Sequence, residues 1–76
     1  MGRTQDRQKQ DDLKQLGSRV REARTGVGYT QEVLAKELGI SVAYVSLIER
    51  GGRNPPWTTV VAIARALQVP LQRLVA

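Results

Sequence analysis

The segment from Thr30 to Glu49 constrains the fold of this 76-residue chain more than any other part of its sequence. Thr30 is a favourable helix N-cap, and the apolar residues after it recur at helical spacing as far as Leu38. Gly39 follows, where a chain that leaves a helix in a left-handed conformation needs a residue without a Cβ. Ser41 is a second N-cap, and the apolar residues after it again share one helical face. The segment therefore predicts two short helices joined by a tight turn.

This arrangement has the spacing of a helix-turn-helix. The stretch TQEVLAKELGISVAYVSLIERG resembles the helix-turn-helix of the phage-repressor (Xre/Cro) family of DNA-binding proteins. The likeness continues into LGSRVREART before it and PPWTTVVAIARALQVPLQRL after it, and so covers most of the chain. The resemblance implies an all-α, five-helix repressor-type domain that binds double-stranded DNA. A helical hairpin that serves only for packing is the alternative, because it fits the apolar pattern equally well.

Composition narrows the possible functions. The chain has no cysteine and no histidine, so it lacks thiolate ligands, disulfides, the commonest metal ligand and the commonest general base. No nucleophile–base pair or phosphate-binding loop is present in the sequence either. We therefore expect no enzyme, no metal and no cofactor. Since there is no long apolar run and no signal-peptide pattern, we expect a cytoplasmic protein without a membrane partner.

The distribution of charge is more informative than the formal total of +5. Residues 30–49 contain one lysine and three glutamates, whereas the segments on either side are basic. A positive field around a mildly acidic motif suits phosphate contacts made from the edges of the motif. Charge alone does not establish that DNA is the partner.

The first part of the chain is polar. Residues 1–11 contain no aliphatic side chain apart from the initial methionine, so they cannot bury an apolar face, and we expect a disordered arm. Some basic arms enter a DNA groove, but Asp6 and Asp11 weaken that interpretation here. We assign residues 12–76 to the DNA-binding domain.

A helix is predicted from about Asp12 to Thr25, because four apolar residues share one of its faces: Leu13, Leu16, Val20 and Ala23. Gly17 within this helix indicates either close packing against a neighbour or a helix that starts near Ser18. The family resemblance also implies that Arg24, near the end of this helix, pairs with Glu49.

Two further helices are predicted after the motif. Residues 57–67 have the apolar spacing of a helix, and we expect Trp57 to cover the core from the loop side. A short fifth helix follows Pro70. Its apolar residues and one from the fourth helix exceed what so small a core can hide. These residues are Val61, Leu71, Leu74 and Val75. They either form a homodimer contact or close the base of the monomer core.

The resemblance also implies how DNA is contacted. The second helix of the motif lies in the major groove, and the first crosses the phosphate backbone. The base-facing positions are Val42, Ala43, Ser46 and Leu47. The phosphate-contacting positions are Gln31, Tyr44 and Arg50, together with Arg53 and Asn54, which compensate for the missing basic residue at Gly52.

The base-facing positions depart from the family pattern. Family members commonly carry Gln, Arg, Asn or Lys there, and these side chains hydrogen-bond to purines. Of the four residues in this chain, only Ser46 can hydrogen-bond to a base. We predict a sequence-specific transcriptional regulator that binds a two-fold operator as a dimer. The principal alternative is a repressor-fold interaction module or an antitoxin, in which Val42 and Leu47 dock a protein.

Overall fold

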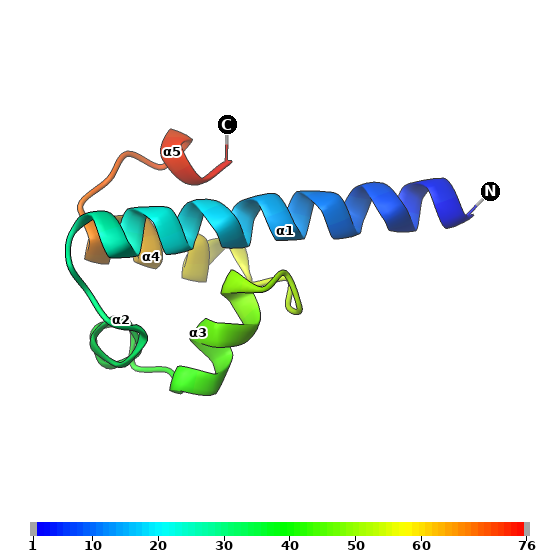
Figure 1. Ribbon diagram of the computed structural model, residues 1–76. Helices are drawn as coiled ribbons and strands as arrows, with labels where there is room; N and C mark the ends of the chain where they lie inside the picture. The colour runs from blue at the N-terminus through cyan, green and yellow to red at the C-terminus, as the bar shows by residue number, and fades with distance from the viewer. Residues whose placement is uncertain (1, 76) are drawn as a thin grey trace.

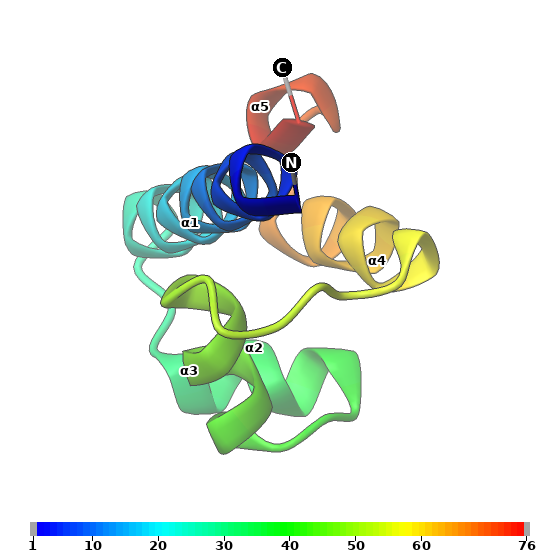
Figure 2. The ribbon, with the colours of Figure 1, turned by 90° about the vertical axis from the view of Figure 1, so that its right-hand side faces the viewer.

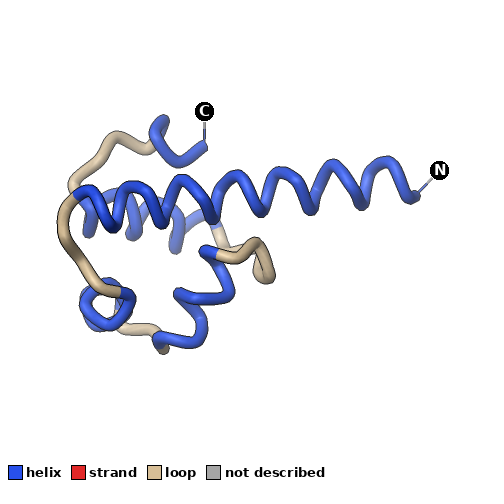
Figure 3. The backbone as a smooth tube through the Cα atoms, viewed as in Figure 1, coloured by secondary structure: helices blue, strands red, loops and turns tan. Residues whose placement is uncertain are grey.

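The computed structural model describes the backbone of residues 2–75 and the side chains of residues 7–75. Within this part of the chain there are helices and no strands, which confirms the predicted all-α, five-helix fold (Figures 1 and 3). The helices are α1 (Gly2–Gly26), α2 (Gln31–Leu38), α3 (Val42–Glu49), α4 (Trp57–Leu67) and α5 (Gln72–Val75).

The N-caps and the turn of the motif form as the sequence predicts. The Oγ1 of Thr30 accepts a hydrogen bond from the amide of Val33 at 3.1 Å, and the Oγ of Ser41 accepts one from the amide of Tyr44 at 3.0 Å. Gly39 adopts a left-handed conformation with φ = 68° at the end of α2. Local capping chemistry therefore fixes the lengths of α2 and α3 and the turn between them.

The core lies where α1, α2, α3 and α4 meet, and α5 closes it from the side of α1 (Figures 1 and 2). Every helix contributes at least one fully buried apolar side chain. Among the described side chains, those that form this core are Val20, Leu34, Ala35, Val45, Ile48, Val60, Ile63, Ala64, Leu67 and Leu74. This shared core holds α2 and α3 at a fixed angle.

Gly17 marks a close approach between α1 and the end of α3. A Cβ built on Gly17 would lie 2.5 Å from the carbonyl oxygen of Glu49. Real Cβ atoms do not come so close to an oxygen, so only glycine fits here. Of the two interpretations of Gly17, the structure supports close packing, because α1 continues through this position without a break.

The prediction of an irregular N-terminal arm is wrong. The structure extends α1 back to Gly2, so residues 2–11 are helical rather than disordered. Most residue types here are adequate helix formers, and extending a helix that packing already holds in place is easier than nucleating a new one. The side chain of Gln8 also donates to Asp12, one turn later, at 3.1 Å. The side chains of residues 7–12 are all exposed, so they add no core.

Two side chains lie elsewhere than expected. Trp57 does not cover the core: it is 60% exposed at the start of α4, and Pro55 in the preceding loop is buried instead. Leu74 is only 1% exposed and belongs to the core of the monomer. Its assignment to a dimer contact is therefore wrong, because it has almost no surface to offer a partner.

Candidate nucleic-acid interface

The outer surface of α3 carries the predicted base-facing residues. Val42 and Ala43 are exposed, and Ser46 and Leu47 are half-buried. The opposite face of the helix is in the core, where Val45 is 1% exposed. The N-cap at Ser41 and the burial of the inner face together fix which side of α3 meets solvent.

The segment after α3 places polar groups beside this surface. Arg50 is exposed, and its Nε donates to the backbone carbonyl of Ser46 at 3.3 Å. Arg53 and Asn54 are exposed in the loop that leads to α4. Tyr44 is half-buried and packs against the core. Three of the predicted phosphate-contacting residues therefore lie together at the C-terminal end of α3, and Tyr44 lies on the helix itself.

Gln31 is more constrained than the sequence suggests. It is half-buried, and its Nε2 donates to the Oε1 of Glu49 at 3.1 Å. Because the Oγ1 of Thr30 already caps the amide of Val33, the amides of Gln31 and Glu32 remain at the start of α2 for an external acceptor. This end of the helix carries a partial positive charge.

A buried ion pair connects the first helix to the end of the motif. The Nε of Arg24 donates to the Oε2 of Glu49 at 2.6 Å, and its Nη2 donates to the Oε1 at 3.0 Å. The Nη1 of Arg24 donates to the backbone carbonyl of Tyr29 at 2.8 Å. Both charged residues are 9% exposed. The guanidinium thus binds the carboxylate with two parallel hydrogen bonds, the strongest geometry for such a pair.

The electrostatics of the pair follow from this geometry. The hydrogen bond to Glu49 raises the pKa of Arg24 above its ordinary value; burial opposes the rise, and the charges of Glu49 and Glu32 add to it. Glu49 accepts hydrogen bonds from Arg24 on α1 and Gln31 on α2. The carboxylate therefore joins three helices at one point. No pattern in the sequence predicted the hydrogen bond from Gln31 to Glu49.

The remaining residues assigned to a dimer contact lie on α4, just before α5 and at the end of α5. Val61 and Leu71 are half-buried, and Val75 is 45% exposed. A groove of about 430 Å³ runs between α1 and α5 beside Val75, with Leu74 in its wall. This edge offers apolar surface, although less than the sequence suggested.

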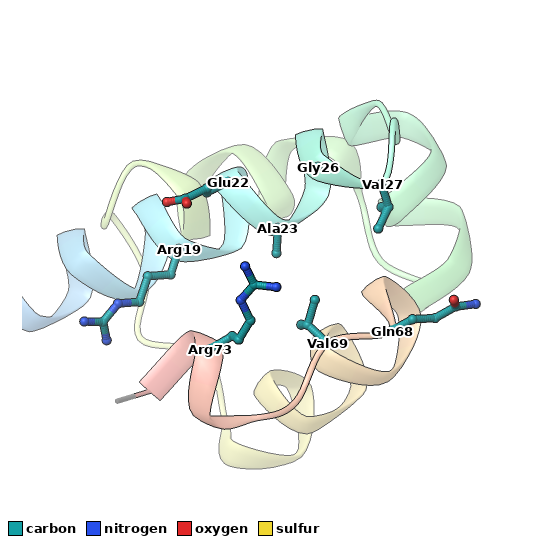
Figure 4. Close-up of a pocket in the computed structure, with 8 residues that line it drawn as sticks. All are labelled: Arg19, Glu22, Ala23, Gly26, Val27, Gln68, Val69 and Arg73. Atoms are coloured by element: carbon teal, nitrogen blue, oxygen red, sulfur yellow. The ribbon is translucent and has the colours of Figure 1, made fainter.

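A second hollow lies between the C-terminal half of α1 and the connection from α4 to α5. It has a volume of about 600 Å³, and Figure 4 shows the guanidinium of Arg73 pointing into it. Ala23 and Val69 form part of its apolar lining. Among the described residues, no group of acidic side chains is arranged to hold a metal ion. Nor is any helix in that part of the chain long and apolar enough to cross a membrane.

Two capped helices at a fixed angle, with the outer face of the second exposed, define the helix-turn-helix class of DNA-binding domain. The comparisons agree: residues 20–74 match the helix-turn-helix family, and this chain belongs to it.

Relatives within the family are named as regulators of transcription. The transcriptional regulator YazB of Bacillus subtilis is 43% identical over 58 residues, which cover 76% of this chain and 84% of YazB. The restriction-modification controller protein C.AhdI from Aeromonas hydrophila has a similar crystal structure. The two structures superpose with a TM-score of 0.80 at 39% sequence identity, and the matched region covers 84% of this chain and 97% of C.AhdI. The DNA-binding domain of BldD has a TM-score of 0.78 at 26% identity, covering 87% and 96% of the two chains.

Proposed function

We propose that this chain is a sequence-specific transcriptional regulator that binds double-stranded DNA as a homodimer on a two-fold operator. The observation that carries the proposal is the outer surface of α3, which the N-cap at Ser41 and the buried inner face hold toward solvent. A helix presented in this way fits the major groove of B-form DNA.

Phosphate contacts would flank this helix on both sides. At one end, the amides of Gln31 and Glu32 lie at the positive end of the α2 dipole, a favourable site for an anion. At the other end, Arg50, Arg53 and Asn54 are exposed. These two sets of groups would position α3 in the groove but would not read the sequence.

Base recognition would depend mostly on apolar contacts. Val42, Ala43 and Leu47 can touch thymine methyl groups, and Ser46 alone can hydrogen-bond to a base edge. A bidentate pair contributes about 1–3 kcal/mol of discrimination, and this surface has no side chain that makes one. We therefore expect much of the specificity to come from DNA shape and from the spacing of half-sites.

The dimer would form through the edge around α5. Val75 is 45% exposed there, beside the half-buried Leu71. Two recognition helices related by a two-fold axis enter the same face of DNA when the half-sites lie about 34 Å apart. The operator is then a pseudo-palindrome with that spacing.

Selection of bound sequences from a random duplex pool tests the proposal directly. We expect a two-fold motif whose halves are separated by one helical turn. A variant with Arg50 and Arg53 replaced by glutamine is the control, and it should recover far fewer bound molecules. If the unmodified protein enriched no sequence motif at low salt, the proposal would be rejected.

A protein-docking role is the second candidate, because Val42 is 39% exposed on the same surface as Leu47. Salt dependence separates the two roles. With about five phosphate contacts per protomer, log affinity for DNA should fall with log salt at a slope of roughly −4 to −5 per protomer. An apolar docking contact would respond only weakly to salt.

A further inference from the structure

Three exposed cations form a line along α1. Arg7, Lys14 and Arg21 are spaced seven residues apart, and two turns of an α-helix return to almost the same direction, with a drift of about 20° per seven residues. We call these three residues the cationic stripe. At a rise of about 1.5 Å per residue, the stripe is roughly 21 Å long.

The middle of the stripe lies against the end of the helix-turn-helix. A Cβ built on Gly51 would lie 2.9 Å from the Cα of Lys14, so this part of α1 touches the loop that follows α3. The same loop carries the exposed Arg50 and Arg53. The stripe is therefore continuous with the basic edge of the proposed DNA-binding surface.

The N-terminal part of α1 projects past the rest of the domain. Figure 1 shows it extending beyond α3 and the loop after α3, and Figure 2 shows α3 below that projecting end. Arg7 lies on this projection, two helical turns before Lys14. Among the residues of this projection whose side chains the structure describes, residues 7–12, every side chain is exposed.

Within the described part of the chain, these three cations take no part in the buried ion pair, which joins Arg24 to Glu49. Asp11 and Glu22 border the stripe on one side along α1, and both are exposed. A row of cations beside a DNA-binding surface is complementary to a phosphate backbone, which carries one charge per about 1.7 Å of duplex axis.

We propose that the cationic stripe binds the phosphate backbone of the same duplex that α3 reads, and extends the protein–DNA contact beyond the helix-turn-helix. This inference rests on the proposed function. The length of the cationic stripe matches roughly six base pairs at 3.4 Å per step along one strand. Because the contacts are to phosphates, they raise affinity for all sequences about equally.

The chain supplies a matched pair of variants for the test. Arg7→Gln removes a cation from the stripe, whereas Lys9→Gln removes one from the same exposed projection about 200° around the helix. Both leave the domain core untouched. The probe is a long mixed-sequence duplex, and the measurement is the slope of log affinity against log salt between about 50 and 200 mM. Sedimentation of each variant is measured in parallel.

Arg7→Gln should reduce the magnitude of the slope by about 0.9 per protomer, and replacement of all three stripe residues by glutamine should reduce it by about 2.7. Lys9→Gln should leave the slope unchanged. Equal slopes for Arg7→Gln and Lys9→Gln would overturn the inference. So would a loss of affinity in Arg7→Gln that sedimentation traces to a changed oligomeric state, since the stripe would then contact a second copy. If the unmodified protein binds no duplex, the proposed function itself fails.

Discussion

Arg24 and Glu49 lie far apart in the sequence and form a buried ion pair, joined by two hydrogen bonds, between α1 and the last turn of α3. The pair holds the C-terminal end of α3 against α1. Since Gln31 donates to the same carboxylate, the start of α2 is fixed by the same group. The angle of the helix-turn-helix therefore depends on one carboxylate as well as on the apolar core.

Removal of either partner should destabilise the domain strongly. Glu49→Ala leaves the guanidinium of Arg24 buried without its counter-ion, and such a loss amounts to about 3–5 kcal/mol. The pKa of Arg24 is raised in the folded protein, so the contribution of the pair to the free energy of unfolding is fully present below the ordinary pKa of arginine. That contribution is lost only as pH rises through the raised pKa. The destabilisation by Glu49→Ala should therefore be the same throughout the neutral pH range. Urea unfolding of the two proteins measures this loss in the free energy of unfolding. Glu37→Ala, at an exposed site that does not act on Arg24, is the control, and an equal loss there would contradict this account.

A methyl group at Gly17 should also destabilise the fold. Alanine favours a helix over glycine by about 1 kcal/mol, but its Cβ would lie 2.5 Å from the carbonyl oxygen of Glu49. Backbone atoms must then shift, and overpacking of this kind typically amounts to about 1–3 kcal/mol. We expect a lower melting temperature for Gly17→Ala. Gly26→Ala is the matched control, because a Cβ there meets nothing within 4 Å; it should be neutral or stabilising. A stabilised Gly17→Ala would show that the two helices can separate freely.

The sequence predicted the motif well because its signals are local. Thr30 and Ser41 cap their helices, Gly39 turns the chain, and the apolar spacing fixes which faces are buried. These interactions form within one or two helical turns, so they can be identified without tertiary structure. The bounds of α4 were predicted correctly for the same reason.

The errors came from features that depend on tertiary packing. Whether Leu74 meets a partner or the core depends on where α5 folds back, which no local pattern specifies. Trp57 was assigned by its apolar character, but Pro55 is the loop residue that is buried, and Trp57 is exposed. The helical state of residues 2–11 depends on the packed part of α1 downstream. The seven-residue spacing of Arg7, Lys14 and Arg21 was visible in the sequence but has meaning only once that helix is continuous.

Base preference should depend on Ser46 more than on any other side chain of α3. Ser46→Ala removes the one hydroxyl among the four residues that we propose face the bases, so it should change which base is preferred at one position of each half-site. Gln31→Ala should instead weaken binding to all sequences about equally, because we propose that the start of α2 contacts a phosphate rather than a base. Selection from a random duplex pool with both variants measures the two effects. If Gln31→Ala changed the preferred sequence and Ser46→Ala did not, the roles of α2 and α3 would be misassigned.

Dimerisation should depend on the exposed edge of α5. Val75 is 45% exposed, so Val75→Glu should leave the monomer folded while placing a charge in the proposed interface, where it lacks a partner. We expect monomers in sedimentation, and a loss of operator affinity because each half-site is then bound independently. Val33→Glu is the matched control for sedimentation, since Val33 is similarly exposed, at 41%, but lies on α2 rather than near α5. Leu74→Glu is unsuitable, because a glutamate at that buried position would unfold the core. A Val75→Glu protein that sediments like the unmodified chain would place the dimer contact elsewhere.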